Sequence, residues 1–246
     1  MDTYFDLGGY SFPVTTQSTE AQKWFDRGIL WTYGYNHEEA VICFERAIDA
    51  DPKCAMAYWG AGYASGPNYN MPWDLFDYAG RAAAARAGYA HARKALDMID
   101  GVTRWEAALI NALPARYPQP EPLDPEAMKS WNVDFADAMR DVFAVHPESH
   151  EVRAVFAESL LNLTPWKMWD LPSGQPASGA RTVEAQTVLE EAMEGDPSAM
   201  HHPGLLHLYV HLMEMSPFPE KALKAGDALR RLVPDAGHLI LSLIHI

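Results

Sequence analysis

Residues 21–52 constrain the fold more than any other stretch, because they predict two helices packed against each other. Their sequence is AQKWFDRGILWTYGYNHEEAVICFERAIDADP. Core-type residues recur three and four apart in residues 24–31 and, after a break at Gly34–Asn36, again in residues 40–47, which places them on one face of each helix. Pro52 then ends the unit. Two amphipathic helices joined by a short turn form a helical hairpin.

This hairpin resembles a tetratricopeptide repeat (TPR), a unit of about 34 residues that folds into two antiparallel helices. The resemblance rests on small and large residues in the expected register: Trp24, Gly28, Trp31, Ala40, Phe44, Ala47 and Pro52. Small residues such as Gly28 and Ala40 let the two helices approach closely, and the aromatic side chains fill the space between them.

The spacing of the second helix returns twice near the C-terminal end. Residues at relative positions 0, 4, 7 and 12 are Ala40, Phe44, Ala47 and Pro52, then Ala185, Leu189, Ala192 and Pro197, then Ala222, Gly226, Leu229 and Pro234. The resemblance implies an all-α fold, a TPR-like α-solenoid of about five helical hairpins in a right-handed superhelix. We expect this array to occupy residues 19–240, after an irregular lead-in at residues 1–18.

Periodicity predicts where the helices lie. Beyond the first hairpin and the segment that follows Pro52, helices are expected near residues 79–99, 104–113, 126–145, 151–163, 181–195, 205–215 and 220–232. Ser18 or Thr19 is expected to cap the first helix, and Asn36 lies at the turn into the second. No alternating pattern predicts a β-hairpin.

Composition narrows the class of protein. The chain has 246 residues, 48% hydrophobic and 21% charged residues, and a formal net charge of −14. This acidic balance disfavours nucleic acid and anionic membranes as partners. Neither a signal peptide nor an apolar run long enough to span a membrane is recognised. The two cysteines, Cys43 and Cys54, are expected to be free thiols in a reduced, cytoplasmic setting.

The last six residues, LSLIHI at 241–246, resemble a translated sequencing adapter. We expect them to be a non-native tail on an incomplete reading frame, and no role is assigned to His245.

Histidines concentrate in residues 201–214, which read HHPGLLHLYVHLME. On an α-helix His207, His211 and Glu214 fall within an arc of about 60°. Each follows a core position of the repeat register, and in TPR proteins that next position faces the concave groove. The same register places His238 at the groove-facing start of a following helix.

Two histidines four residues apart on a helix can bind one transition metal, and a third histidine or a carboxylate completes a site with an open position. The candidate ligands are His202, His207, His211, Glu214 and His238. Zinc, copper or iron would suit them. Two alternatives stay open: the histidines could act as general acid and base without metal, or only hydrogen-bond their neighbours. His202, which precedes Pro203, could simply begin a helix.

The register also predicts ligand-binding residues along the groove: Trp59, Tyr63, Asn68, Tyr69, Asn70 and Glu158. Residues Thr164–Trp169 lie in the longest predicted loop, which could cover that groove. Two functions therefore compete. One is a TPR-like scaffold that binds a protein, peptide or small ligand in its groove; the other is a metal-dependent or histidine acid–base enzyme with its site around His207, His211, Glu214 and His238. The oligomeric state is not indicated.

Overall fold

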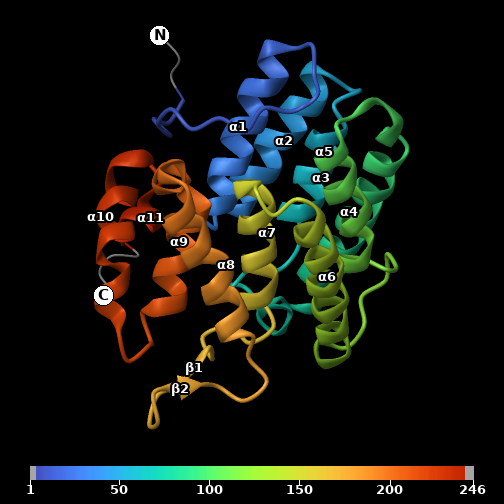
Figure 1. Ribbon diagram of the computed structural model, residues 1–246. Helices are drawn as coiled ribbons and strands as arrows, with labels where there is room; N and C mark the ends of the chain where they lie inside the picture. Colours follow the sequence, from blue (N-terminus) through green and yellow to red (C-terminus); the bar gives the residue numbers. More distant parts are fainter. Residues whose placement is uncertain (1–3, 242–246) are drawn as a thin grey trace.

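The computed structural model describes residues 4–241, with side chains through residue 239, and is mainly helical (Figure 1). Its helices are α1 (Thr19–Tyr33), α2 (His37–Ala50), α3 (Ala55–Ala64), α4 (Tyr78–Leu96), α5 (Arg104–Ala112), α6 (Pro125–Val145), α7 (His150–Leu161), α8 (Thr182–Gly195), α9 (Pro203–Met213), α10 (Leu223–Leu232) and α11 (Gly237–Leu241). The predicted all-α class is confirmed. Residues 242–246, most of the expected non-native tail, lie outside the described residues.

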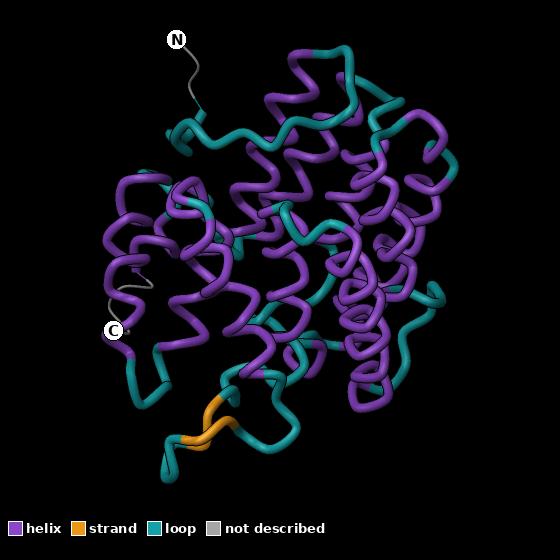
Figure 2. The backbone as a smooth tube through the Cα atoms, viewed as in Figure 1, coloured by secondary structure: helices purple, strands orange, loops and turns teal. Residues whose placement is uncertain are grey.

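Short 3₁₀ turns lie at Trp73–Leu75, Ile99–Gly101, Leu113–Arg116, Pro197–His201 and Pro219–Ala222. One small hairpin was not predicted. Strands β1 (Trp169–Asp170) and β2 (Gln175–Pro176) pair antiparallel in the loop between α7 and α8 (Figure 2). Each strand has two residues, too few for an alternating pattern to show in the sequence.

The predicted helix caps are confirmed by hydrogen bonds. Ser18 Oγ accepts from the Ala21 backbone N–H at 3.1 Å, and Asn36 Oδ1 accepts from that of Glu39 at 3.4 Å. These bonds satisfy backbone donors that the first turn of a helix leaves unpaired. Asn36 therefore fixes the point where the chain leaves α1 and turns into α2.

The first three helices pack closely around one aromatic ring. Phe44 of α2 is fully buried, and its ring fills the space beside Gly28 of α1 and Gly60 of α3. A Cβ atom at Gly28 would come within 2.6 Å of that ring, and one at Gly60 within 2.4 Å. Gly28, a small residue of the sequence pattern, thus lies where two helices approach closely.

Helices that follow one another in the chain pack side by side, and α9 in addition packs against α1 and α7 (Figure 1). The contact with α1 is close: a Cβ atom at Gly204 would lie 2.7 Å from the ring of Tyr33. The C-terminal helices therefore return to the N-terminal ones, and residues about 170 positions apart share one interior.

Residues 4–18 run without helix across the ends of several helices. The backbone N–H and the hydroxyl of Thr15 each donate to the buried carboxylate of Glu106 at 2.6 Å. Tyr10 donates to Glu151 Oε1 at 2.9 Å. The lead-in therefore ties the start of α5 to the start of α7.

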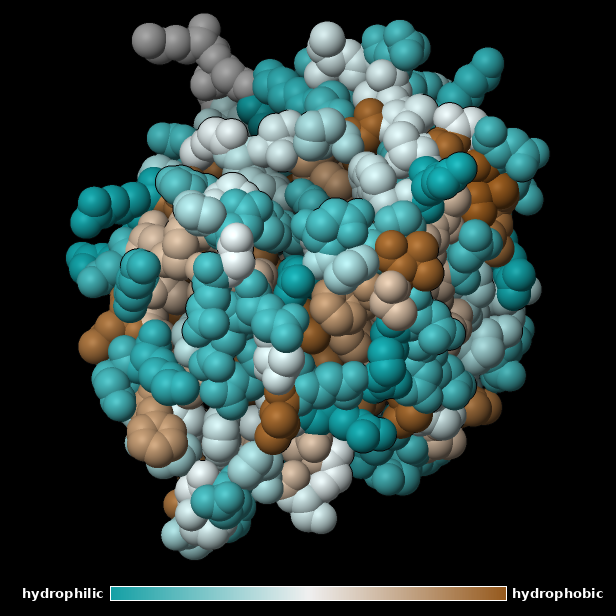
Figure 3. Space-filling view, in the orientation of Figure 1, coloured by the Kyte–Doolittle hydropathy of each residue, from teal (hydrophilic) through white to brown (hydrophobic). Residues whose placement is uncertain are grey.

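The surface shown in Figure 3 is hydrophilic over most of its area, with apolar side chains scattered among polar ones. Within the described residues no helix has the length and apolar character needed to cross a bilayer. Cys43 and Cys54 are free and buried, as the sequence predicts.

Replacing Gly28 with alanine should lower the free energy of unfolding by about 1–3 kcal/mol, because the new methyl group overpacks the Phe44 ring. Gly195, at the end of α8, has open space where its Cβ would lie. Gly195→Ala is the matched control and should leave stability unchanged or raise it by up to about 1 kcal/mol. Urea unfolding followed by circular dichroism measures both; equal effects would contradict the close packing.

Candidate metal centre

Three histidines from two helices converge in the structure. His207 and His211 lie one turn apart on α9, and His238 is the second residue of α11. One ligand nitrogen from each lies within 4.8 Å of the other two. The ring centroids are 4.5 Å apart for His207 and His211, 5.1 Å for His207 and His238, and 5.8 Å for His211 and His238. The structure thus brings together three of the five residues predicted as ligands.

His207 is oriented by the end of α1. Its Nδ1 lies 2.7 Å from the backbone carbonyl oxygen of Tyr33. A carbonyl oxygen can only accept, so Nδ1 carries the proton and Nε2 is the unprotonated nitrogen. Burial, reinforced by the neighbouring rings of His211 and His238, lowers the pKa of His207 well below its ordinary value. The ring is therefore neutral, which is the form that binds a metal.

His211 is oriented by Glu214. Its Nδ1 lies 3.0 Å from Glu214 Oε1, and both side chains are buried, with 3% and 7% exposure. Nε2 of His211 is buried and has no hydrogen-bond partner among the described residues. Glu214, predicted as a ligand, instead stands behind His211, where carboxylates commonly support a metal-binding imidazole.

A strained tyrosine packs against all three rings. Tyr35 has a positive φ of 56°, uncommon for a residue other than glycine. Its ring centroid is 4.6 Å from that of His207 and 5.5 Å from those of His211 and His238. Its hydroxyl oxygen is buried without a hydrogen-bond partner among the described residues. Sequence reasoning missed Tyr35: the break at Gly34–Asn36 marks a turn, but nothing in it signals this backbone conformation.

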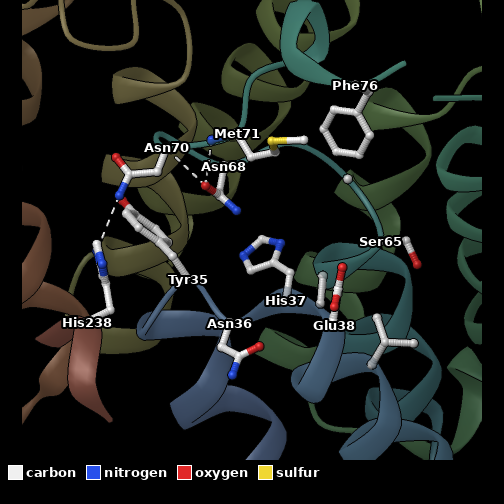
Figure 4. Close-up of a pocket in the computed structure, with 13 residues that line it drawn as sticks. Tyr35, Asn36, His37, Glu38, Ser65, Asn68, Asn70, Met71, Phe76 and His238 are labelled. Atoms are coloured by element: carbon white, nitrogen blue, oxygen red, sulfur yellow. Dashed lines mark hydrogen bonds between the residues drawn. The ribbon is translucent and has the colours of Figure 1, made fainter. Parts of the chain in front are cut away.

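A cavity of about 730 Å³ adjoins the cluster at His238 (Figure 4). Its apolar wall includes Val41, Met71 and Phe76. The ring of His37 points into it, and both ring nitrogens are buried without a hydrogen-bond partner among the described residues. Burial, with a smaller contribution from the positive charge of Arg116, lowers the pKa of His37 to about 4. His37 is therefore a neutral base at physiological pH.

Three predicted groove residues lie near this cavity and cluster. Asn68 and Asn70 line the cavity, and the Tyr69 ring packs 5.0 Å from that of His211. Asn68 is chiefly a turn former, because its Oδ1 accepts from the backbone N–H groups of Asn70 and Met71, each at 2.9 Å. Nε2 of His238 lies 3.2 Å from Nδ2 of Asn70.

The other three predicted groove residues are buried away from the cavity. Trp59 and Tyr63 are each 1% exposed and stack at 5.2 Å, and Trp59 Nε1 donates to the Leu109 carbonyl oxygen at 3.2 Å. Glu158 is 4% exposed and accepts from the Tyr63 hydroxyl. Burial raises the pKa of Glu158. Helices α5, α6 and α7 cover these side chains: Trp59 bonds to Leu109 of α5, the Tyr63 ring lies 6.2 Å from that of Phe135 of α6, and Glu158 belongs to α7.

Arg116 belongs to the same buried region and was not predicted. Its guanidinium lies 4.7 Å from the centroid of the Tyr63 ring, donates to the Pro67 carbonyl oxygen, and is 1% exposed. A single arginine in the proline-rich connection between α5 and α6 carries no periodic signal from which its burial could be inferred.

His202 is not part of the three-histidine cluster. It caps α9, where its Nδ1 accepts from the Leu205 backbone N–H at 3.1 Å, and its ring packs 5.0 Å from Tyr10 and 5.1 Å from Tyr33. The helix-entry alternative is the one the structure shows. Burial lowers the pKa of His202 to about 3, with the nearby His150 adding to the effect.

Comparison of the chain with family models, with curated proteins and with solved structures found no match. The chemistry of the site therefore has to be derived from its geometry. Three imidazoles that share one space can hold a transition-metal ion, and a fourth coordination position would remain for a small ligand.

His202 should make stability depend on pH. A ring with a pKa of about 3 when folded and about 6.5 when unfolded stabilises the fold fully above pH 6.5. Between pH 6.5 and 3 its contribution falls by about 1.4 kcal/mol per pH unit, because only the unfolded chain takes up the proton.

His202→Asn keeps an N-cap acceptor but does not titrate. Its free energy of unfolding should fall less steeply than that of the wild type between pH 6.5 and 4. His201→Asn, at an exposed neighbouring position, is the control and should keep the wild-type slope. Urea unfolding at stepped pH measures the difference; identical slopes for all three proteins would contradict the buried neutral imidazole.

Proposed function

We propose that this protein binds one divalent transition-metal ion through His207, His211 and His238 and uses it on a small organic molecule held in the adjoining cavity. The observation that carries the proposal is the convergence of three ligand nitrogens within 4.8 Å. Ligands bound about 2.0–2.1 Å from a metal are at most about 4.2 Å apart, so a small contraction would close the site. Imidazole donors suit zinc, copper or iron.

The groups behind the ligands support this function. The Tyr33 carbonyl and the Glu214 carboxylate accept from the Nδ1–H groups of His207 and His211. In the neutral form of each ring, both contacts leave Nε2 as the unprotonated nitrogen. Metal-binding histidines almost always donate their second nitrogen in this way, which fixes ring orientation and raises ligand basicity.

The cavity supports a reaction rather than a purely structural ion. Structural zinc sites use four protein ligands, whereas catalytic sites commonly use three and leave one position open. A metal with an open position can polarise a carbonyl group or activate water. Within the cavity His37 could accept a proton, because its ring is neutral and points inward. The apolar wall of Val41, Met71 and Phe76 favours a substrate with an apolar part.

The scaffold we propose is a TPR-like right-handed α-solenoid. The placement of Phe44 between Gly28 and Gly60 supports this proposal, as does the side-by-side packing of successive helices. Binding of a protein or peptide along an open groove has less support, because Trp59, Tyr63 and Glu158 are buried. The metal and the small molecule would instead share the part of the concave side that stays accessible next to His238.

Protein dialysed against Zn²⁺ should retain one equivalent by elemental analysis. His207→Gln or His211→Gln should weaken Zn²⁺ binding by at least about 100-fold, and Glu214→Gln by about 10–100-fold, the range typical of lost support behind a ligand. His146 lies outside the cluster, so the control variant His146→Gln should bind Zn²⁺ as tightly as the wild type does. If the folded wild-type protein retains no Zn²⁺, the metal-site proposal is wrong. Acid–base catalysis by the histidines is then the remaining enzymatic hypothesis.

The open position and the cavity can be tested together with Co²⁺-substituted protein. Hydroxamates bind metals with open positions and should alter its visible absorption spectrum. Benzohydroxamate should bind about ten-fold more tightly than acetohydroxamate, because its phenyl ring would be partly buried against the apolar wall. Phe76→Ala should reduce that preference, whereas Phe218→Ala, at a position 53% exposed and outside the cavity, should not. Equal affinities for the two hydroxamates would contradict a substrate cavity next to the open metal position, and the metal site itself would stand.

A further inference from the structure

Two loops meet at His238 through a chain of hydrogen bonds. Trp166, in the loop between α7 and α8, donates from Nε1 to Asn70 Oδ1 at 3.2 Å. Asn70, in the loop between α3 and α4, lies with Nδ2 3.2 Å from His238 Nε2 (Figure 4). The long loop that the sequence predicts as a cover therefore reaches the candidate metal centre through a single asparagine.

The chemistry of these groups fixes the direction of both hydrogen bonds. An indole N–H can only donate, so the Asn70 atom that faces Trp166 is the amide oxygen. The amide nitrogen then faces His238, and it too can only donate. His238 Nε2 must therefore accept, which places the proton of the neutral ring on Nδ1.

A ring in that state cannot bind a metal while both hydrogen bonds persist. If Nε2 binds the ion, Asn70 loses its acceptor. If Nδ1 binds the ion, the proton moves to Nε2 and two donors face each other unless the Asn70 amide turns over. Turning the amide places its nitrogen against the Trp166 N–H and breaks that bond instead. Either route breaks one hydrogen bond of the chain.

We propose that Asn70 and Trp166 form a latch on His238 and that the metal binds Nδ1, so that the Asn70 amide turns over and releases the loop carrying Trp166. This inference rests on the proposed metal site and adds a coupling between that site and a cover. Asn70 sits in a tight turn, held by Asn68 Oδ1 and by two backbone hydrogen bonds between Asn68 and Met71. Trp166 is the partner that moves: it is 40% exposed and has a positive φ of 57°.

The latch also explains how a ligand would enter. Asn70 and His238 both line the cavity, and the Trp166 ring lies 6.3 Å from the ring of Tyr69, which in turn packs against His211. Release of Trp166 from Asn70 would let the Asn70 side chain move at the edge of the cavity next to His238. The metal-loaded protein would then be the form that accepts the small molecule.

Three variants separate the latch from a merely structural contact. Asn70→Ala removes the competing donor and should raise Zn²⁺ affinity about five-fold, the size of one net hydrogen bond. Trp166→Phe lets the Asn70 amide turn freely and should raise affinity by a similar factor. Asn70→Asp accepts from Trp166 and from a protonated His238 Nε2 together, so it should raise affinity by about ten-fold or more.

Zn²⁺ affinity would be measured by competition with a chromophoric chelator, and release of the loop by tryptophan fluorescence. Zn²⁺ should shift wild-type emission, and the shift should be absent from Trp166→Phe and from Asn70→Asp, where the latch stays closed. Trp105→Phe removes a tryptophan that stacks on Phe12, away from the latch, and should keep both the shift and the wild-type affinity. Circular dichroism establishes that each variant is folded.

The outcomes distinguish the two proposals. If wild-type protein binds one Zn²⁺ but all three variants bind within two-fold of it, the latch is wrong and the metal site stands. A Zn²⁺-dependent emission shift that survives in Trp166→Phe would likewise overturn the latch. If neither the wild type nor any variant binds Zn²⁺, the metal site and the latch both fall.

Discussion

The contact between the end of α1 and the start of α9 is the interaction on which the rest of the site depends. The last carbonyl groups of a helix lack partners within the helix, and one of them, at Tyr33, accepts from His207. Gly204 makes the approach possible, because any side chain there would collide with the Tyr33 ring. This one contact closes the interior, fixes the proton of His207 on Nδ1, and carries His211 into the same space.

Several buried polar atoms of the interior have no hydrogen-bond partner among the described residues. The Tyr35 hydroxyl, both nitrogens of His37 and Nε2 of His211 are buried without hydrogen-bond partners among the described residues. An unpaired buried polar atom costs about 1–3 kcal/mol, and the positive φ of Tyr35 adds backbone strain. A chain built for stability alone would place apolar side chains at these positions. These four atoms border one cluster and one cavity, where a bound metal and ligand would supply the missing partners.

Helices and their ends could be read from the sequence because they depend on local spacing. The helices expected at 104–113 and 126–145 appear as α5 and α6, with ends one residue away or closer. The repeat register also placed His207, His211 and His238 in one hollow, since that register depends on how each hairpin faces its neighbours. It put Glu214 among the ligands, whereas the side chain is long enough to turn back onto His211.

Burial of Trp59, Tyr63 and Glu158 could not be predicted in the same way, because it follows from the packing of α3 with α5, α6 and α7. The hydrogen bond between Tyr63 and Glu158 joins residues 95 positions apart and leaves no mark on the spacing within either hairpin. The same limit applies to Arg116, whose burial depends on α3 and α6, and to Tyr35, whose positive φ lies in a turn packed against the three histidine rings. The register of a single hairpin predicts which way a side chain points, but it does not predict which other helix packs over that side chain.

The helices and the loops have different roles at the candidate site, and these roles follow from the contacts described above. Helix α9 holds His207 and His211 at a fixed separation of one turn, which suits ligands that must keep their geometry. The loops on either side, with Asn70 and Trp166, contribute single hydrogen bonds and partly exposed side chains, which suits parts that must open at small cost in free energy. His238 connects the two, because it is a ring of the cluster and also the acceptor at the end of the loop contact. The residues that would bind the metal and those that would admit its ligand are therefore joined at one imidazole, so neither group can change its state without affecting the other.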